Sequence, residues 1–169
     1  MAWLSDVARK RKARFFLSRL PRDARILEAG SGDGRFAASA RAAGWTHYTT
    51  LDAAAPADLA GDLREWRALG LEPASFDAVL AFEVVEHAPC FQEMHDLLRP
   101  GGLLMLTSPA PRWDWACRLL EQLGLTQRRT SPHAHLIDFH DVPLFEPVTL
   151  RRPAGIAQWG VFRKPERPA

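Results

Sequence analysis

The sequence predicts an α/β fold, with an open, mostly parallel sheet and helices on both of its faces. Short apolar runs alternate with segments of helical periodicity through the middle of the chain, as strands and crossover helices do. A glycine-rich turn joins the first apolar run to the first of these segments. After residue 147 the pattern changes to two apolar runs around Pro-Ala-Gly, which predicts an antiparallel hairpin.

Proline and glycine mark the element boundaries in the first half of the chain. Pro21 and Gly44 end the first two predicted helices, since proline cannot continue a helix and glycine commonly caps one. No full helix fits between the second and third predicted strands, which a proline-containing connection joins. The elements predicted in this half are helices at 3–20 and 34–43 and strands at 25–29, 47–52 and 57–62.

The second half continues the alternation. The run FDAVLAF is apolar almost throughout, as expected for a strand that is covered on both faces. Pro100 and Gly101 end the helix that follows it, and Gly124 ends the next one. The elements predicted in this half are strands at 76–82 and 102–108, helices at 91–98 and 112–123, and the hairpin at 148–164.

Length and composition indicate one domain over residues 1–169. A content of 47% hydrophobic residues supports one well-buried core. No apolar run approaches the roughly 20 residues that cross a membrane, and the first residues lack the apolar core of a signal peptide, so we expect a soluble, cytoplasmic protein. Cys90 and Cys117 form no CxxC pair, and we expect small buried residues rather than a disulfide or a zinc site.

Positive charge is concentrated at the N-terminus, although the net charge is only +2. Eight lysines and arginines lie within the first 25 residues, against Asp6 and Asp23. We interpret this run as the solvated face of a helix. The alternative is a surface that contacts the phosphates of nucleic acid or lipid.

The turn after the first strand has the pattern E-x-G-x-G-x-G, from Glu28 to Gly34. Glycine allows the backbone to turn sharply and approach a ligand, and the turn delivers the N-terminus of the next helix. Asp52, at the end of the second strand, is placed to accept hydrogen bonds from two ribose hydroxyls. Gly32, Gly34 and Ala37 also fit a nicotinamide-binding G-x-G-x-x-A turn. Glu28 favours a cofactor with an amino group, because a pyrophosphate would repel it.

Several segments together resemble the class I S-adenosylmethionine-dependent methyltransferases, in particular small methyltransferase-domain proteins. The resemblance covers most of residues 25–109, in the family's order. It implies a Rossmann-like sheet of about seven strands that ends in an antiparallel hairpin, with S-adenosylmethionine as cofactor. The segments that carry it are ILEAGSGDGRF, LD at 51–52, AGDL at 60–63, SFDAVLAFEVVEH at 75–87 and LLRPGGLLMLTSP at 97–109.

The resemblance also implies roles for individual residues. Glu28 and the backbone at the three glycines would face the methionine end of the cofactor. Asp52 and the adjacent Ala53 would lie at the ribose, Asp62 and the backbone of Leu63 at the adenine, and the residues ending the fourth strand at the methyl group. The implied cofactor-binding residues are Glu28, Gly30, Gly32, Gly34, Asp52, Ala53, Asp62, Leu63, Phe82 and Glu83.

Histidines are the candidates for removing a proton from the methyl acceptor, since methyl transfer itself requires no covalent residue. His87 follows the fourth strand, and His133, His135 and His140 cluster further on; we favour His87 and His135 as catalytic. A metal site in the cluster with Asp138 is an alternative, and we predict no metal. Trp113 and Trp115 are candidates for a wall of the acceptor pocket or for helix packing.

These observations predict a methyltransferase whose acceptor the sequence does not identify. We expect a small-molecule or a lipid- or sugar-type acceptor, with nucleic acid or protein as alternatives through the basic N-terminus. A cofactor-binding subunit without activity and a nicotinamide-dependent oxidoreductase are the competing hypotheses. Within one domain, we assign 1–24 to the basic helix, 25–109 to the cofactor-binding core and 110–169 to the acceptor side and the hairpin.

Overall fold

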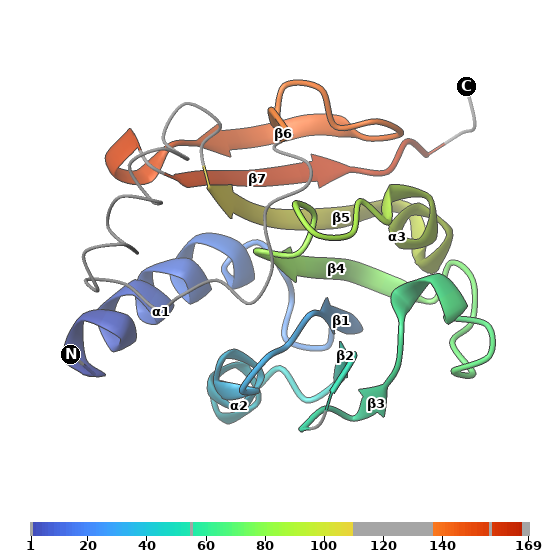
Figure 1. Cartoon of the computed structure of the whole chain (residues 1–169), viewed down its shortest axis with the longest axis horizontal. Helices are drawn as coiled ribbons and strands as arrows, with labels where there is room; N and C mark the ends of the chain where they lie inside the picture. The colour runs from blue at the N-terminus through green and yellow to red at the C-terminus, as the bar shows by residue number, and fades with distance from the viewer. Residues whose placement is uncertain (1, 55, 110–136, 156, 167–169) are drawn as a thin grey trace.

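In the residues that the computed structural model describes (2–54, 56–109, 137–155 and 157–166), seven strands form one sheet in the order β3-β2-β1-β4-β5-β7-β6. Figure 1 shows the strands one above another, from β6 at the top to β3 at the bottom. The strands are β1 (Ile26–Ala29), β2 (Tyr48–Asp52), β3 (Leu59–Ala60), β4 (Phe76–Phe82), β5 (Leu98–Pro109), β6 (Glu146–Arg151) and β7 (Ala157–Arg163). The helices are α1 (Ala2–Leu17), α2 (Arg35–Ala42), α3 (Phe91–Leu97) and the 3-10 turns η1 (Leu63–Glu65) and η3 (Pro153–Gly155).

The pairing of the strands confirms the predicted fold class. β1 pairs in parallel with β2 and β4, β2 with β3, and β4 with β5. β7 runs antiparallel to both β5 and β6, so the predicted C-terminal hairpin lies at one end of the sheet. The chain leaves β1 in one direction toward β2 and later returns on its other side as β4, and such a reversal of strand order is where α/β sheets bind ligands.

Successive residues of the central strands face opposite layers, as pleated strands require. Ile26 and Leu80 contact α1 and α2, together with Phe16 and Phe36. Leu27, on the other face, packs with the layer that contains α3 and Trp66. The central strands are therefore buried on both faces, which explains why their sequences are almost continuously apolar.

Three element boundaries differ from the sequence prediction. α1 ends at Leu17 rather than at residue 20, because tight turns from Arg19 N–H to Phe16 O and from Leu20 N–H to Leu17 O close its end. β3 has only two residues. β5 begins at Leu98, directly after α3, and its register against β4 shifts between Phe76 and Ala78. The predicted helix at 112–123 lies outside the described residues.

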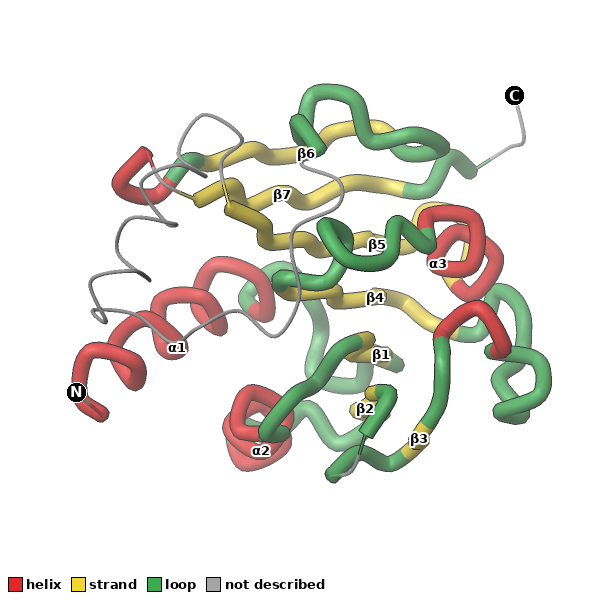
Figure 2. Tube along the Cα trace, viewed as in Figure 1, coloured by secondary structure: helices red, strands yellow, loops and turns green. Residues whose placement is uncertain are grey.

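A loop replaces a helix between β3 and β4. Residues 61–75 contain only the short turn η1, as the tube in Figure 2 makes clear. Trp66, which is 2% exposed, covers the sheet there by packing into the apolar layer of α3.

Among the described residues, no helix combines the length and the apolar character that crossing a membrane requires.

Candidate active site

The β1–α2 turn has the left-handed backbone that its glycines allow. Gly30, Gly32 and Gly34 have φ values of 73°, 55° and 68°, and Gly34 is the N-cap of α2. A Cβ at Gly30 would lie 2.3 Å from Val84 Cγ2, so this glycine is needed for the fold. A Cβ at Gly32 would meet no atom within 4 Å and would project into open space. The second glycine therefore leaves room where a ligand would approach the backbone.

Asp52 lies directly beneath this turn. Its Oδ2 accepts a hydrogen bond from Gly32 N–H at 2.8 Å, and its Oδ1 accepts one from Ala54 N–H at 3.1 Å. β1 and β2 are parallel neighbours, so the carboxyl end of β2 delivers Asp52 to the turn after β1. The carboxylate thus connects the glycine turn to the segment that contains Ala53, and each of its oxygens keeps a lone pair for a further donor.

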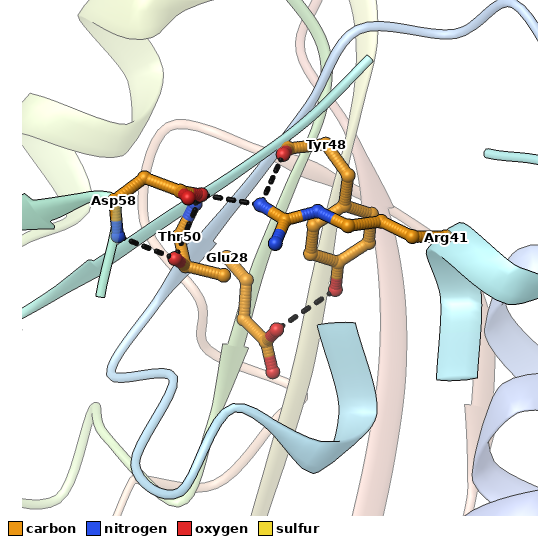
Figure 3. Close-up of polar contacts among 5 residues, drawn as sticks. All are labelled: Glu28, Arg41, Tyr48, Thr50 and Asp58. Carbon is orange, nitrogen blue, oxygen red and sulfur yellow. Dashed lines mark hydrogen bonds and ion pairs between the residues drawn. The ribbon is translucent and has the colours of Figure 1, made fainter. Parts of the chain in front are cut away.

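Glu28 is a buried carboxyl group on the face of the sheet that α1 and α2 cover. The residue is 3% exposed. Its Oε2 accepts a hydrogen bond from Tyr48 Oη at 2.9 Å (Figure 3). Burial raises the pKa of Glu28 to about 7, although the Tyr48 hydrogen bond and the charge of Lys12 oppose this. A buried carboxyl group with a pKa raised in this way is typical of a functional site.

A polar network holds the end of the β2–β3 connection close to β2. Thr50 donates hydrogen bonds to Asp58 from both its N–H and its hydroxyl at 2.8 Å, and Asp58 N–H donates back to Thr50 Oγ1 at 2.8 Å. Arg41 pairs with Asp58 and donates to Tyr48 O at 2.7 Å (Figure 3). This clamp limits the movement of the segment that follows Asp52.

Asp62 caps η1. It accepts a hydrogen bond from Arg64 N–H at 2.9 Å and forms an ion pair with the Arg64 guanidinium at 2.5 Å. These side-chain and backbone hydrogen bonds from Arg64 lower the pKa of Asp62 to about 2. Leu63, the first residue of η1, is buried. The cap fixes the backbone of Leu63 at the carboxyl end of β3.

Phe82, at the end of β4, is held between the two helices of its face. Its ring centroid lies 5.0 Å from that of Phe16 on α1 and 4.9 Å from that of Phe36 on α2. Lys12 extends from α1 over the same ring, with Nζ 4.7 Å from the centroid. The sequence interpretation of the basic run as a solvated face is therefore wrong for Lys12.

Lys12 reaches the carboxyl ends of β4 and β5. Its Nζ donates a hydrogen bond to Thr107 Oγ1 at 3.4 Å, and Thr107 Oγ1 donates to Glu83 Oε1 at 2.6 Å. Burial lowers the pKa of Lys12, against the opposing charges of Glu83, Glu28 and Glu86. The charges of three carboxyl groups thus act on this ammonium group.

Glu83 and Glu86 follow β4 directly. Glu83 has a φ of 57°, a left-handed conformation that non-glycine residues seldom adopt and that is common at functional sites. Glu86 is 1% exposed, and its Oε2 has no hydrogen-bond partner within the described part of the chain. Burial, followed by the charge of Glu83, raises the pKa of Glu86 to about 7.

A cleft of about 360 Å³, which we call the carboxyl-end cleft, lies beside these groups. It is bordered by the glycine turn, α1 and the end of β4, and its lining includes Lys12, Glu28, Gly30, Ser31, Phe36 and Phe82. The hydroxyl of Ser31 is buried and has no hydrogen-bond partner among the described residues. A cavity of similar volume, about 350 Å³, lies at the opposite ends of the strands, near Arg25 and Phe76.

The structure brings together most, but not all, of the residues singled out from the sequence. His87 is exposed in the loop after β4, with its N–H donating to Val84 O at 2.9 Å. His140 is exposed, and Cys90 is a free buried thiol. The described residues contain no group of three potential metal ligands. Trp113, Trp115, Cys117, His133 and His135 lie outside the described residues.

Four residues of this region were missed by reasoning from sequence: Lys12, Tyr48, Glu86 and Thr107. A signal existed for Lys12, because Phe15 and Phe16 follow it at i+3 and i+4 and so share its helix face. Tyr48 and Glu28 meet only through the pairing of β2 with β1, which places Thr50 beside Glu28. No local pattern in the sequence indicates that contact.

Comparison with known proteins identifies the family. A family model described as a methyltransferase domain matches residues 2–150. No curated protein sequence matches the chain significantly. Solved structures share the fold at low identity. PH0226 protein from Pyrococcus horikoshii OT3 is 16% identical, with a TM-score of 0.69 over 93% of this chain and 90% of that one.

Two further structures have named methyltransferase activities. N-methyltransferase NodS from Bradyrhizobium japonicum WM9 is 18% identical, with a TM-score of 0.62 over 96% of this chain and 97% of that one. Burkholderia thailandensis 1,6-didemethyltoxoflavin-N1-methyltransferase was solved with 1,6-didemethyltoxoflavin and S-adenosylhomocysteine. It is 20% identical, with a TM-score of 0.59 over 97% of this chain and 81% of that one.

The family match spans the glycine turn, the acids at the strand ends and the cleft between them, and the strand order agrees with these solved folds. The chain belongs to the methyltransferase-domain family and is a class I S-adenosylmethionine-dependent methyltransferase.

Proposed function

We propose that S-adenosylmethionine binds in the carboxyl-end cleft, with its methionine part against Glu28 and the glycine turn. The observation that carries this proposal is the buried Glu28 carboxyl at the wall of a cleft of about 360 Å³. A cationic ligand would compensate the cost of keeping this group ionised. The unpartnered hydroxyl of Ser31, on the same wall, supplies a further polar contact.

The other cofactor contacts follow from the ends of the strands. We assign the ribose to Asp52 and Ala53, the adenine to Asp62 and the backbone of Leu63, and the methyl group to the region of Phe82 and Glu83. The free lone pairs of Asp52 and the space beside Gly32 support the first assignment. When bound, the cofactor supplies an activated methyl group, and the protein's part is to orient it and exclude water.

For the acceptor we propose a small molecule, with lipid- and sugar-type compounds included. The Burkholderia neighbour acts on a small molecule according to its name. The inward direction of Lys12 removes one charge from the basic surface that a nucleic acid would contact. Proton removal by His87 or His135 stays a prediction, as does the assignment of 110–169 to the acceptor side.

A binding experiment tests the cofactor site. Titration calorimetry of the purified chain should detect S-adenosylmethionine and S-adenosylhomocysteine, and no binding of NADH. Asp52→Ala should weaken the affinity by about 1–3 kcal/mol, because two ribose hydroxyls lose their acceptor. Asp23→Ala, at an exposed aspartate before β1, is the matched control and should bind as the unmodified chain does. Equal affinity in both variants would remove Asp52 from the site.

We propose a cytoplasmic location, which the free thiol of Cys90 supports, since thiols persist in reducing compartments. A Haloferax volcanii methyltransferase with 17% identity was solved in complex with the Trm112 methyltransferase activator. Addition of a purified activator of that class to the assay would test whether a partner also raises turnover here.

A further inference from the structure

Two carboxyl groups, Glu83 and Glu86, follow β4, and Glu86 takes no part in the assigned cofactor contacts. Thr107 Oγ1 orients Glu83 through a hydrogen bond of 2.6 Å. Glu86 is almost completely buried, and one of its oxygens has no partner within the described residues. The hydroxyl of Ser108, on the neighbouring strand β5, is buried, and its hydrogen bonding with Glu86 lowers the pKa of that carboxyl against the larger effect of burial. A buried, unpaired carboxyl oxygen is costly unless a ligand completes it.

A cation from the chain itself already lies at this place. The Lys12 ammonium is 3.4 Å from Thr107 Oγ1 and 4.7 Å from the centroid of the Phe82 ring. The charges of Glu83, Glu28 and Glu86 all act on it. Aromatic faces and carboxylates are the groups that bind ammonium ions in proteins.

We propose that the methyl acceptor is an amine, which binds between Phe82 and the pair Glu83 and Glu86 in the place that the Lys12 ammonium takes in this structure. The inference rests on the proposed function, because the acceptor would lie beside the cofactor cleft, in which Phe82 and Lys12 are lining residues. It adds the chemical class of the substrate, and it makes Glu86 the base for an amine in place of the histidines predicted from the sequence.

The environment discriminates between amines and hydroxyls. Methyl transfer to nitrogen needs a neutral amine with a free lone pair. Burial lowers the pKa of the Lys12 amine here even with three carboxyl groups nearby. Burial and the adjacent Glu28 instead raise the pKa of the Tyr48 hydroxyl well above its ordinary value. The same face of the sheet thus favours a neutral amine, which is nucleophilic, and a neutral hydroxyl, which is a poor nucleophile.

The proposed step is balanced in protons and charge. The amine enters as an ammonium ion and gives one proton to the carboxylate of Glu86, for which a pKa of about 7 is suited to accepting a proton near neutral pH. The nitrogen lone pair then forms a bond to the methyl carbon while the carbon–sulfur bond breaks. Its electron pair stays on sulfur, which yields S-adenosylhomocysteine and a methylated ammonium ion.

Matched pairs of amine and alcohol test the acceptor class. Benzylamine with benzyl alcohol, phenylethylamine with phenylethanol, and tryptamine with tryptophol share a skeleton within each pair. With methyl-labelled S-adenosylmethionine and the full chain, we expect at least tenfold faster transfer to the amines. A chain that binds the cofactor in calorimetry but methylates the alcohols equally well, or methylates none of the amines, overturns the inference while leaving the proposed function intact. Absence of cofactor binding overturns the proposed function itself.

Variants test the role of each group. Glu86→Gln, which preserves shape, should lower kcat/KM for the amine at least tenfold and abolish the rise of kcat with pH near 7, with cofactor affinity unchanged. Lys12→Met should lower KM for the amine, because a competing cation is removed. Controls are Glu72→Gln and Lys10→Met, at exposed positions. An unchanged pH profile in Glu86→Gln, or an unchanged KM in folded Lys12→Met, would contradict the assignment.

Discussion

Replacing Glu28 with glutamine should stabilise the protein at alkaline pH while it abolishes cofactor binding. Glu28 is 3% exposed, and burial raises its pKa from 4.5 to about 7. Each pKa unit corresponds to 1.36 kcal/mol, so ionised Glu28 costs the folded state about 3 kcal/mol above pH 7. Glutamine removes this cost, and its carbonyl oxygen can still accept the hydrogen bond from Tyr48.

The sign of the pH dependence follows from the direction of the shift. Between pH 4.5 and about 7 the folded protein keeps the Glu28 proton and the unfolded chain has lost it, so stability falls as pH rises through this window. At pH 5 the cost is less than about 1 kcal/mol. The gain from Glu28→Gln should therefore grow by about 2–3 kcal/mol between pH 5 and pH 8.5.

Urea denaturation of both proteins at the two pH values measures this difference, and the comparison across pH cancels effects of the amide that do not titrate. For a chain of this length, the expected change corresponds to a shift of the melting temperature of roughly 4–12 °C. Glu72→Gln, at an exposed site, should show no such dependence. An equal or smaller gain at pH 8.5 than at pH 5 would refute the claim that Glu28 is held ionised at a cost.

Glycine and core substitutions give further tests. Gly32→Val should abolish S-adenosylmethionine binding in calorimetry, because its side chain would fill the open space beside the turn, and the φ of 55° also strains the backbone of a β-branched residue. Gly30→Ala should instead lower the free energy of unfolding by about 1–3 kcal/mol, because the new Cβ would overlap Val84. Retained binding in folded Gly32→Val would place the cofactor elsewhere. Trp66→Ala should cost about 3–5 kcal/mol in urea denaturation, and a loss below about 1 kcal/mol would show that the loop before β4 adds little to the core.

Local patterns were sufficient for most of the fold. The apolar runs of β1, β4 and β5, the stop at Gly44 and the hairpin after residue 147 each depend on residues close together in the chain, and each was predicted within a few residues. The boundary of α3 and β5 was not, because Pro100 and Gly101 lie inside a strand that shifts register there. Strand pairing overrode the local signal for a turn.

The residues of the candidate site were likewise predicted only in part from the sequence. Glu28, the three glycines and Asp52 were predicted from sequence because they lie in or directly after strands whose carboxyl ends meet at one edge, and a left-handed backbone needs glycine locally. Lys12 was not predicted, since its partners Phe82 and Thr107 are 70 and 95 residues away. Its position depends on how α1 packs against the sheet.

The sequence by itself determined the family, the order of the strands' apolar segments and the acids and glycines at their ends, because these depend on periodicity and backbone conformation over a few residues. Only the tertiary structure decided which carboxyl groups are buried, that Tyr48 pairs with Glu28, and that Lys12 reaches Thr107 and the Phe82 ring. Burial and electrostatic contact depend on strand register and helix packing, which bring together residues that are distant in the chain.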